Sequence, residues 1–164
     1  ERPPEWLSKG CIFACTFGID YSKLLEDIEP VTQAGFGVEG WIDEVLASLK
    51  SDRGGPQVDM KRDFFPYLGR RTTFVMDYDE PTLGWGDQIL LAIEVTDSDR
   101  VAAFVDQLLS VDPDYHKITR EGENIWSEKT PNAGAIDNQA ICVAHNHLFI
   151  SNLDLLVETL RRKK

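Results

Sequence analysis

Apolar residues recur along this chain at two spacings, and these spacings predict its strands and helices. Residues 88–96 alternate between two apolar rows at a period of two, which is typical of a strand inside a sheet. Residues 98–110 repeat at the i, i+3, i+4, i+7 spacing of a helix packed on a sheet, with Asp97 or Ser98 as its N-cap. A strand followed at once by a capped helix indicates a packed α and β domain.

Two hairpins and a closing helix follow in the second half of the chain. Residues 115–129 predict a hairpin that turns around Gly122, because glycine accepts a positive φ. Residues 139–151 predict a second hairpin that turns at His145 and Asn146. The apolar residues that follow this hairpin have helical spacing and predict a final amphipathic helix with inward-facing Leu153, Leu156, Val157 and Leu160.

The first half of the chain mixes helices with single strands. Residues 10–18 are a short apolar run bounded by glycines, which predicts a buried strand. Asp20 then caps a short helix that we expect Pro30 to end. Residues 38–50 predict a second helix with Trp41 beside its apolar stripe. That stripe consists of Val38, Ile42, Val45, Leu46 and Leu49.

A polar loop, a helical turn and a strand connect these halves. Residues 51–57 are rich in glycine and polar side chains and predict a loop, and residues 60–68 predict a short helical turn. Residues 71–78 alternate as a half-buried strand does. The hairpins favour an α+β fold, mainly an antiparallel β-sheet covered by amphipathic helices on one face. We expect one domain over residues 5–164, belonging to a longer parent protein.

The charge balance limits the partners that this chain can bind. Its 164 residues include 28 acidic and 17 basic side chains, which gives a net charge of −11. Such a charge repels nucleic acid and anionic lipid, so neither is expected as a partner. No apolar run approaches the roughly 20 residues of a membrane span, so this segment is not expected to insert into a membrane. Glu1 in place of methionine indicates a mature form or an excised part.

Carboxylates and histidines form one candidate catalytic set. Asp77, Asp79 and Glu80 follow a predicted strand and could hold a hard cation or act as acid and base. His145 or His147 could join them in a metal-dependent hydrolase. The simpler interpretation is a solvated acidic loop and a hairpin turn, because no further ligands stand at metal-site spacing. No metal and no cofactor are therefore expected.

Other chemical motifs have structural explanations. Cys11 and Cys15 are four residues apart, which is neither the zinc nor the redox spacing, and we expect them to be buried apolar residues. Residues 35–40 read GFGVEG and match the dinucleotide pattern, but no strand precedes them, so they predict the start of a helix. Trp85 lies between glycines in a loop, where it could form a contact platform or fold back over the sheet.

Three stretches of the sequence resemble a bacterial family of uncharacterised extracytoplasmic proteins. The stretches are a helix and glycine loop leading into DFFPYLGRRTTFVMDYD, then LLAIEVTDSDRVAAFVDQLL, and then ICVAHNHLFISNLDLLVETL. The resemblance covers most of the chain from Val38 onward. It implies a location in the cell envelope or periplasm and a long parent protein, and it transfers no catalytic or ligand residue.

These patterns favour a non-catalytic module of an exported or envelope-anchored protein that contacts a protein or small ligand. The contact residues expected from the sequence are Trp85, Asp77, Asp79 and Glu80. The alternative is the metal-dependent hydrolase, which requires the acidic loop and the histidines to meet in space. The position of Asp77 relative to His145 and His147 therefore tests the alternative.

Overall fold

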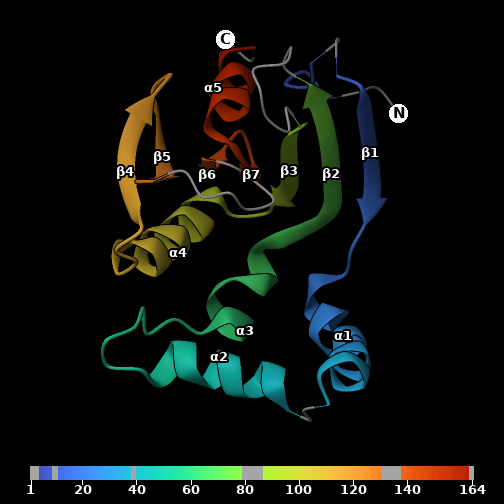
Figure 1. Cartoon of the computed structure of the whole chain (residues 1–164), viewed down its shortest axis with the longest axis vertical. Helices are drawn as coiled ribbons and strands as arrows, with labels where there is room; N and C mark the ends of the chain where they lie inside the picture. The colour runs from blue at the N-terminus through green and yellow to red at the C-terminus, as the bar shows by residue number, and fades with distance from the viewer. Residues whose placement is uncertain (1–3, 9–10, 38–39, 79–86, 131–137, 163–164) are drawn as a thin grey trace.

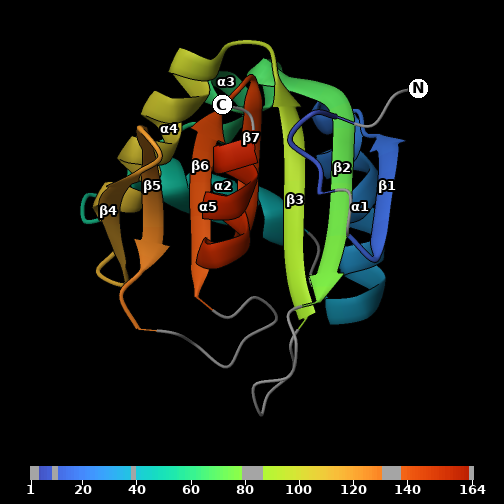
Figure 2. The same cartoon turned by 90° about the horizontal axis from the view of Figure 1, so that it is seen from above.

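A seven-stranded antiparallel sheet forms the centre of the computed structural model (Figure 2). The structure describes residues 4–8, 11–37, 40–78, 87–130 and 138–162. Across the sheet the strands are β1 (Phe13–Gly18), β2 (Leu68–Tyr78), β3 (Asp87–Val95), β7 (His147–Asn152), β6 (Gln139–Ala144), β5 (Glu123–Glu128) and β4 (Tyr115–Arg120). This architecture confirms the predicted α+β class.

Helices cover both faces of the sheet, whereas the sequence predicted cover on one face (Figure 1). The helical segments are α1 (Tyr21–Phe36), α2 (Trp41–Ser51), α3 (Met60–Asp63), the 3-10 turn η1 (Phe65–Tyr67), α4 (Ser98–Ser110) and α5 (Leu153–Arg162). The two faces arise because neighbouring strand residues point to opposite sides, and β3 and β7 are apolar on both. None of the described helices combines the length and the apolar character needed to cross a membrane.

Two hydrophobic cores form, one on each face of the sheet. The α5-side core joins Leu155, Leu156 and Leu160 of α5 to Leu90 and Phe149 of the sheet. Trp6 belongs to this core, and its ring meets that of Phe149 edge to face at 5.4 Å. The α4-side core consists of Tyr21, Leu68, Ile93, Val95, Val101, Val105, Leu109 and Leu148. The central strands are therefore buried on both sides.

Both predicted hairpins and the predicted cap of α4 are confirmed. Glu121 and Gly122 connect β4 to β5 with positive φ values of 52° and 85°. His145 and Asn146 connect β6 to β7 with φ values of 55° and 60°, which two-residue hairpin turns of this kind require. The Asp97 side chain accepts a hydrogen bond from the backbone N–H of Arg100, as an N-cap does.

The first half of the chain departs from its predicted structure at Pro30. Helix α1 continues past Pro30 to Phe36, although proline leaves one backbone carbonyl of the preceding turn without its usual donor. Gly37 then ends the helix in the left-handed conformation, and its N–H bonds to the Gln33 carbonyl oxygen. The C-terminal cap and packing against α2 keep the last turns helical.

Strand β1 exists as predicted, but the prediction that it is buried was wrong. It lies at the edge of the sheet and pairs, among the described residues, with β2 alone. Of its residues only Cys15 is half-buried, and the others are exposed. An apolar run predicts a strand from its own residues, whereas burial depends on what lies beyond it in the sheet.

The predicted stripe of α2 is only partly buried. Ile42 is buried, Leu46 and Leu49 are half-buried, and Val45 is exposed, while Val38 lies outside the described residues. Trp41 is exposed at the start of the helix. The apolar side of α2 therefore faces the protein at one position and solvent at others.

Candidate functional site

The structure does not bring the predicted acidic and histidine residues together. Asp77 pairs with Gln88 at one end of β3, and His147 pairs with Glu94 near the other end. Six residues of strand separate these positions, which corresponds to about 20 Å. Asp77 therefore cannot share a metal ion with His147. Asp79, Glu80 and Trp85 lie outside the described residues.

His147 packs as a structural side chain. Its Nδ1 lies 2.9 Å from the carbonyl oxygen of His145, across the hairpin turn. Its ring meets Trp6 edge to face and stacks against Phe149, both at 5.6 Å between centroids. Among the described residues, no group of three His, Cys, Asp or Glu side chains could hold a metal ion. These contacts match the turn interpretation of the histidines.

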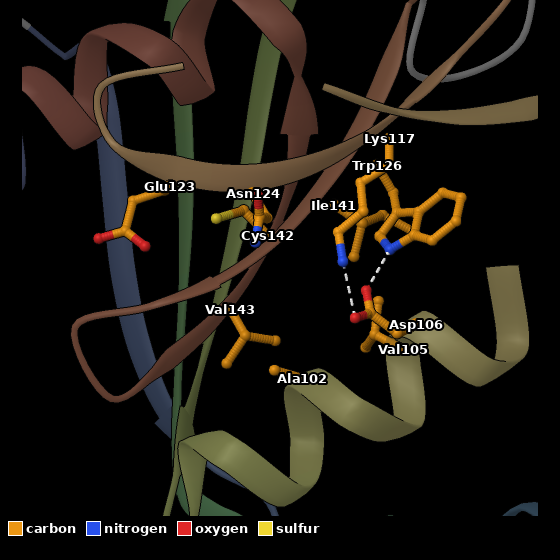
Figure 3. Close-up of a pocket in the computed structure, with 10 residues that line it drawn as sticks. All are labelled: Ala102, Val105, Asp106, Lys117, Glu123, Asn124, Trp126, Ile141, Cys142 and Val143. Carbon is orange, nitrogen blue, oxygen red and sulfur yellow. Dashed lines mark hydrogen bonds and ion pairs between the residues drawn. The ribbon is translucent and has the colours of Figure 1, made fainter. Parts of the chain in front are cut away.

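A small pocket lies between α4 and strands β4, β5 and β6 (Figure 3). In it the Asp106 carboxylate accepts hydrogen bonds from Trp126 Nε1 and from Lys117 Nζ, each at 2.7 Å. Lys117 Nζ also lies over the Trp126 ring, 5.7 Å from its centroid. Side chains from β4 and β5 therefore meet at one carboxylate of α4. No spacing in the sequence indicated this cluster.

The electrostatics of this cluster keep Asp106 ionised. Burial raises the pKa of Asp106, but the hydrogen bonds from Lys117 and Trp126 and the Lys117 charge outweigh burial, so the pKa lies below its usual value. A carboxylate with a lowered pKa is a weak base at neutral pH. Asp106 therefore suits an ion pair better than proton transfer.

The pocket is too small to hold a metabolite. Its volume is about 100 Å³, whereas pockets for small molecules typically enclose about 300 to 1,000 Å³. The Asp106, Lys117 and Trp126 cluster joins α4 to the outer strands of the sheet. We interpret it as a structural contact.

The three cysteines differ in accessibility. Cys142 is 1% exposed, and burial together with the nearby Glu123 charge raises its pKa to about 12. A thiol with this pKa is protonated at neutral pH and is a poor nucleophile. Cys11 and Cys15 are only half-buried, so the prediction that they are buried apolar residues was wrong. They lie in and beside an edge strand that leaves them partly open.

A second, open hollow lies between α2 and α3, with a volume of about 530 Å³. Two ion pairs line it, Lys50 with Asp59 at 2.7 Å and Lys61 with Asp43 at 2.8 Å. The Asp43 hydrogen bond and charge, with smaller contributions from the more distant Glu29 and Glu26, raise the pKa of Lys61. Lys61 of α3 is therefore held by the Asp43 carboxylate of α2.

The glycine-rich stretch between α1 and α2 caps helices. Gly37 closes α1, and Gly40 stands at the N-cap of α2 with a φ of 74°. The Gly40 N–H donates to the Glu29 carboxylate at 3.0 Å. A carboxylate of this chain therefore occupies the start of α2, where a nucleotide loop would bind phosphate. The prediction of a helix start is confirmed.

Large exposed apolar side chains concentrate in the first part of the chain. Among the described residues they are Ile12, Phe13, Phe17, Ile28, Val31, Trp41, Val45 and Val111. All but Val111 belong to β1 or its flank, α1 or α2. We define the α1–α2 surface as Ile28, Val31, Trp41 and Val45. The apolar residues of α2 and β1 were predicted, but their exposure was not.

Comparisons with protein-family models, with curated proteins and with solved structures find no match. The resemblance to an extracytoplasmic family therefore stays a prediction.

Proposed function

We propose that this chain is a non-catalytic interaction module that contacts another protein through its α1–α2 surface. The exposed Ile28, Val31, Trp41 and Val45 carry the proposal. Exposed apolar residues gathered on neighbouring elements mark interaction sites more often than isolated ones do. Trp41 adds an aromatic side chain of the kind that dominates binding energy at interfaces.

The charges around this surface define the chemistry of the partner. Exposed carboxylates on the same two helices are Glu26, Asp27, Asp43 and Glu44. The same helices carry only two exposed cations, Lys23 and Lys50, and apolar side chains on such acidic helices complement a partner surface that is apolar and basic. The partner is therefore a protein that presents apolar and basic side chains together.

The proposed setting is the cell envelope, as part of a longer exported protein. The sequence resemblance supports this location. A contact module there would act by joining its parent protein to a neighbour, so no cofactor is required.

A photo-crosslinking amino acid placed at Val31 tests the contact, with the same amino acid at Val111 as the matched control. Both positions are exposed valines, on α1 and just after α4. We expect a defined protein adduct from position 31 in cells, and none from position 111. The variant Asp43→Lys should weaken the adduct because it opposes a basic partner, whereas Glu158→Lys on α5 should not. Equal crosslinking at both valines, or no effect of Asp43→Lys, contradicts the proposal.

A further inference from the structure

The outer edge of β1 carries backbone groups directed away from the sheet. The Ile19 N–H donates to the Arg70 carbonyl oxygen at 2.9 Å, which fixes the phase of the β1–β2 ladder. In an antiparallel pair, inward and outward groups alternate along the strand. The backbone N–H and C=O groups of Phe13, Cys15 and Phe17 therefore form their hydrogen bonds with β2. Residues 14 and 16 direct their N–H and C=O groups to the outside.

Both side-chain faces of this strand are also open. Phe13 is 48% and Phe17 is 42% exposed, and they lie on the face toward α1. Ala14 and Thr16 lie on the opposite face, where Thr16 shares a hydrogen bond with Thr73. Figure 2 shows β1 as the last strand of the sheet. Among the described residues, no strand pairs with its outer edge.

We propose that β1 pairs with β1 of a second copy of this chain, antiparallel and about a two-fold axis at Cys15. The two sheets then join into one continuous sheet. The axis lies on Cys15 because this register pairs residues 13–17 of one copy, all within β1, with residues 13–17 of the other. Ala14 of each copy exchanges backbone hydrogen bonds with Thr16 of the other.

The side chains in this register complement one another. Phe13 of each copy lies beside Phe17 of the other, and such aromatic pairs across strands are favourable. Just before β1, Ile12 is 70% exposed, and continuing the pairing by one residue places it beside Gly18 of the second copy, where no side chain competes for space. The edge thus supplies both a bulky residue and the position that receives it, as a self-complementary interface requires.

The β1 edge can meet a second copy despite the net charge of −11. Residues 11–19 contain no charged side chain, so no like charges meet at the axis. The interface therefore adds no charge repulsion of its own.

The other edge of the sheet is protected against such pairing. Strand β4 carries His116, Lys117 and Arg120 along its six residues. Charged side chains, lysine above all, are the usual protection of an edge strand. The same pairing at β4 would place like charges close together, so the proposal concerns β1 alone. Because one strand forms the interface, we expect a dissociation constant in the micromolar range.

Sedimentation velocity over a wide concentration range tests the proposal with the whole chain. We expect the wild type to form a dimer and the Ala14→Pro variant to be monomeric. Proline removes an N–H that points outward, so β1 keeps its bonds to β2. Thr119→Pro is the matched control: the Lys129 N–H bond to Asp114 O sets the β4 ladder so that Thr119 also points outward. This control should still dimerise.

A second variant and a crosslink distinguish loss of the interface from loss of folding. Phe17→Lys keeps every backbone hydrogen bond and should also give a monomer, with an unchanged circular dichroism spectrum. In a Cys11→Ala, Cys142→Ala background, diamide should oxidise the two Cys15 thiols to one disulfide and take up their two protons and two electrons. The paired Cα atoms would lie about 4.5 Å apart, which a disulfide can span.

Three results overturn the proposal. They are a wild type that stays monomeric up to about 0.5 mM, a dimer that survives both Ala14→Pro and Phe17→Lys, or a folded dimer without Cys15 crosslinking. Photo-crosslinking at Val31 tests a different surface, so each proposal can fail without the other.

Discussion

Helices α4 and α2 have similar apolar spacing but very different surroundings. Helix α4 buries Val101, Phe104, Val105 and Leu109 against the sheet. Helix α2 buries Ile42 and leaves Val45 and Trp41 exposed. An apolar stripe therefore shows which side of a helix is suited to burial. Whether this chain or a partner covers that side depends on the tertiary arrangement.

The two regions also differ in how polar side chains hold them. On α4, Asp106 accepts from both Lys117 and Trp126 across three elements. On α2, Asp43 pairs with Lys61 in an ion pair whose side chains are both mostly exposed. Exposed ion pairs contribute about 0 to 1 kcal/mol. The Asp106 cluster therefore ties α4 to the sheet at two points, whereas the Asp43 pair ties α2 only to Lys61.

The largest expected difference comes from one substitution made in both regions. Val101→Ala on α4 should lower the free energy of unfolding by about 2 to 3 kcal/mol, because it leaves a cavity at a residue that is 0% exposed. Val31→Ala on α1, at a residue that is 66% exposed, should change it by about 0.5 kcal/mol or less. Both changes bring the same gain in helix propensity. Urea denaturation measures both, and equal midpoints would mean that the two valines contribute equally to stability.

A smaller difference is expected from removing one carboxylate charge in each region. Asp106→Asn should cost about 1 kcal/mol after allowance for solvent screening, because Trp126 Nε1 and Lys117 then lose a charged acceptor. Asp43→Asn, the control, should cost about 0 to 0.5 kcal/mol. A larger cost at Asp43 would mean that α2 is held more firmly than its exposure indicates.

The wild type and Asp106→Asn should also differ in how their free energy of unfolding depends on pH. Because the folded pKa of Asp106 is lowered, its contribution is complete above the unfolded pKa of about 4 and is lost as pH falls through the folded value. The wild type should therefore lose more stability than Asp106→Asn from about pH 4 downward. Parallel pH profiles for the two proteins would contradict this assignment.

The smallest expected effect is local to α1. Pro30→Ala restores an N–H for the carbonyl oxygen of Glu26 and should slow amide exchange within α1. The free energy of global unfolding should rise by less than about 1 kcal/mol, because Tyr21 is the one residue described in α1 that is buried in a core. Amides of α4 are the internal control. If α1 and α4 already exchange with the same free energy of opening, the two regions unfold together and the contrast disappears.

Local signals predicted the second half of the chain well. The turn residues His145 and Asn146 both have positive φ. The sequence indicated this turn because Asn tolerates that conformation and stands between two apolar strands. The cap at Asp97 and the stripe of α4 are similarly local. These features depend on residues within a few positions of one another, so the sequence alone predicts them.

The remaining features depend on arrangement in space. Strand β1 was expected to be buried because nothing in its residues shows that it ends the sheet. The Asp106, Lys117 and Trp126 cluster joins three elements with no shared spacing. Of the predicted contact residues the structure describes Asp77, and it lies far from the histidines. Long-range placement therefore accounts for most of what the sequence did not predict.

The strand order carries a consequence for synthesis of the protein. β1, β2 and β3 form one meander and β4, β5 and β6 another, and the later strand β7 joins them by pairing with β3 and β6. A nascent chain that has not yet exposed β7 therefore holds two three-stranded sheets that are not yet joined. Closure between them brings together residues far apart in the chain, which slows folding. Until β7 emerges from the ribosome, β3 and β6 are the edges most exposed to wrong pairing.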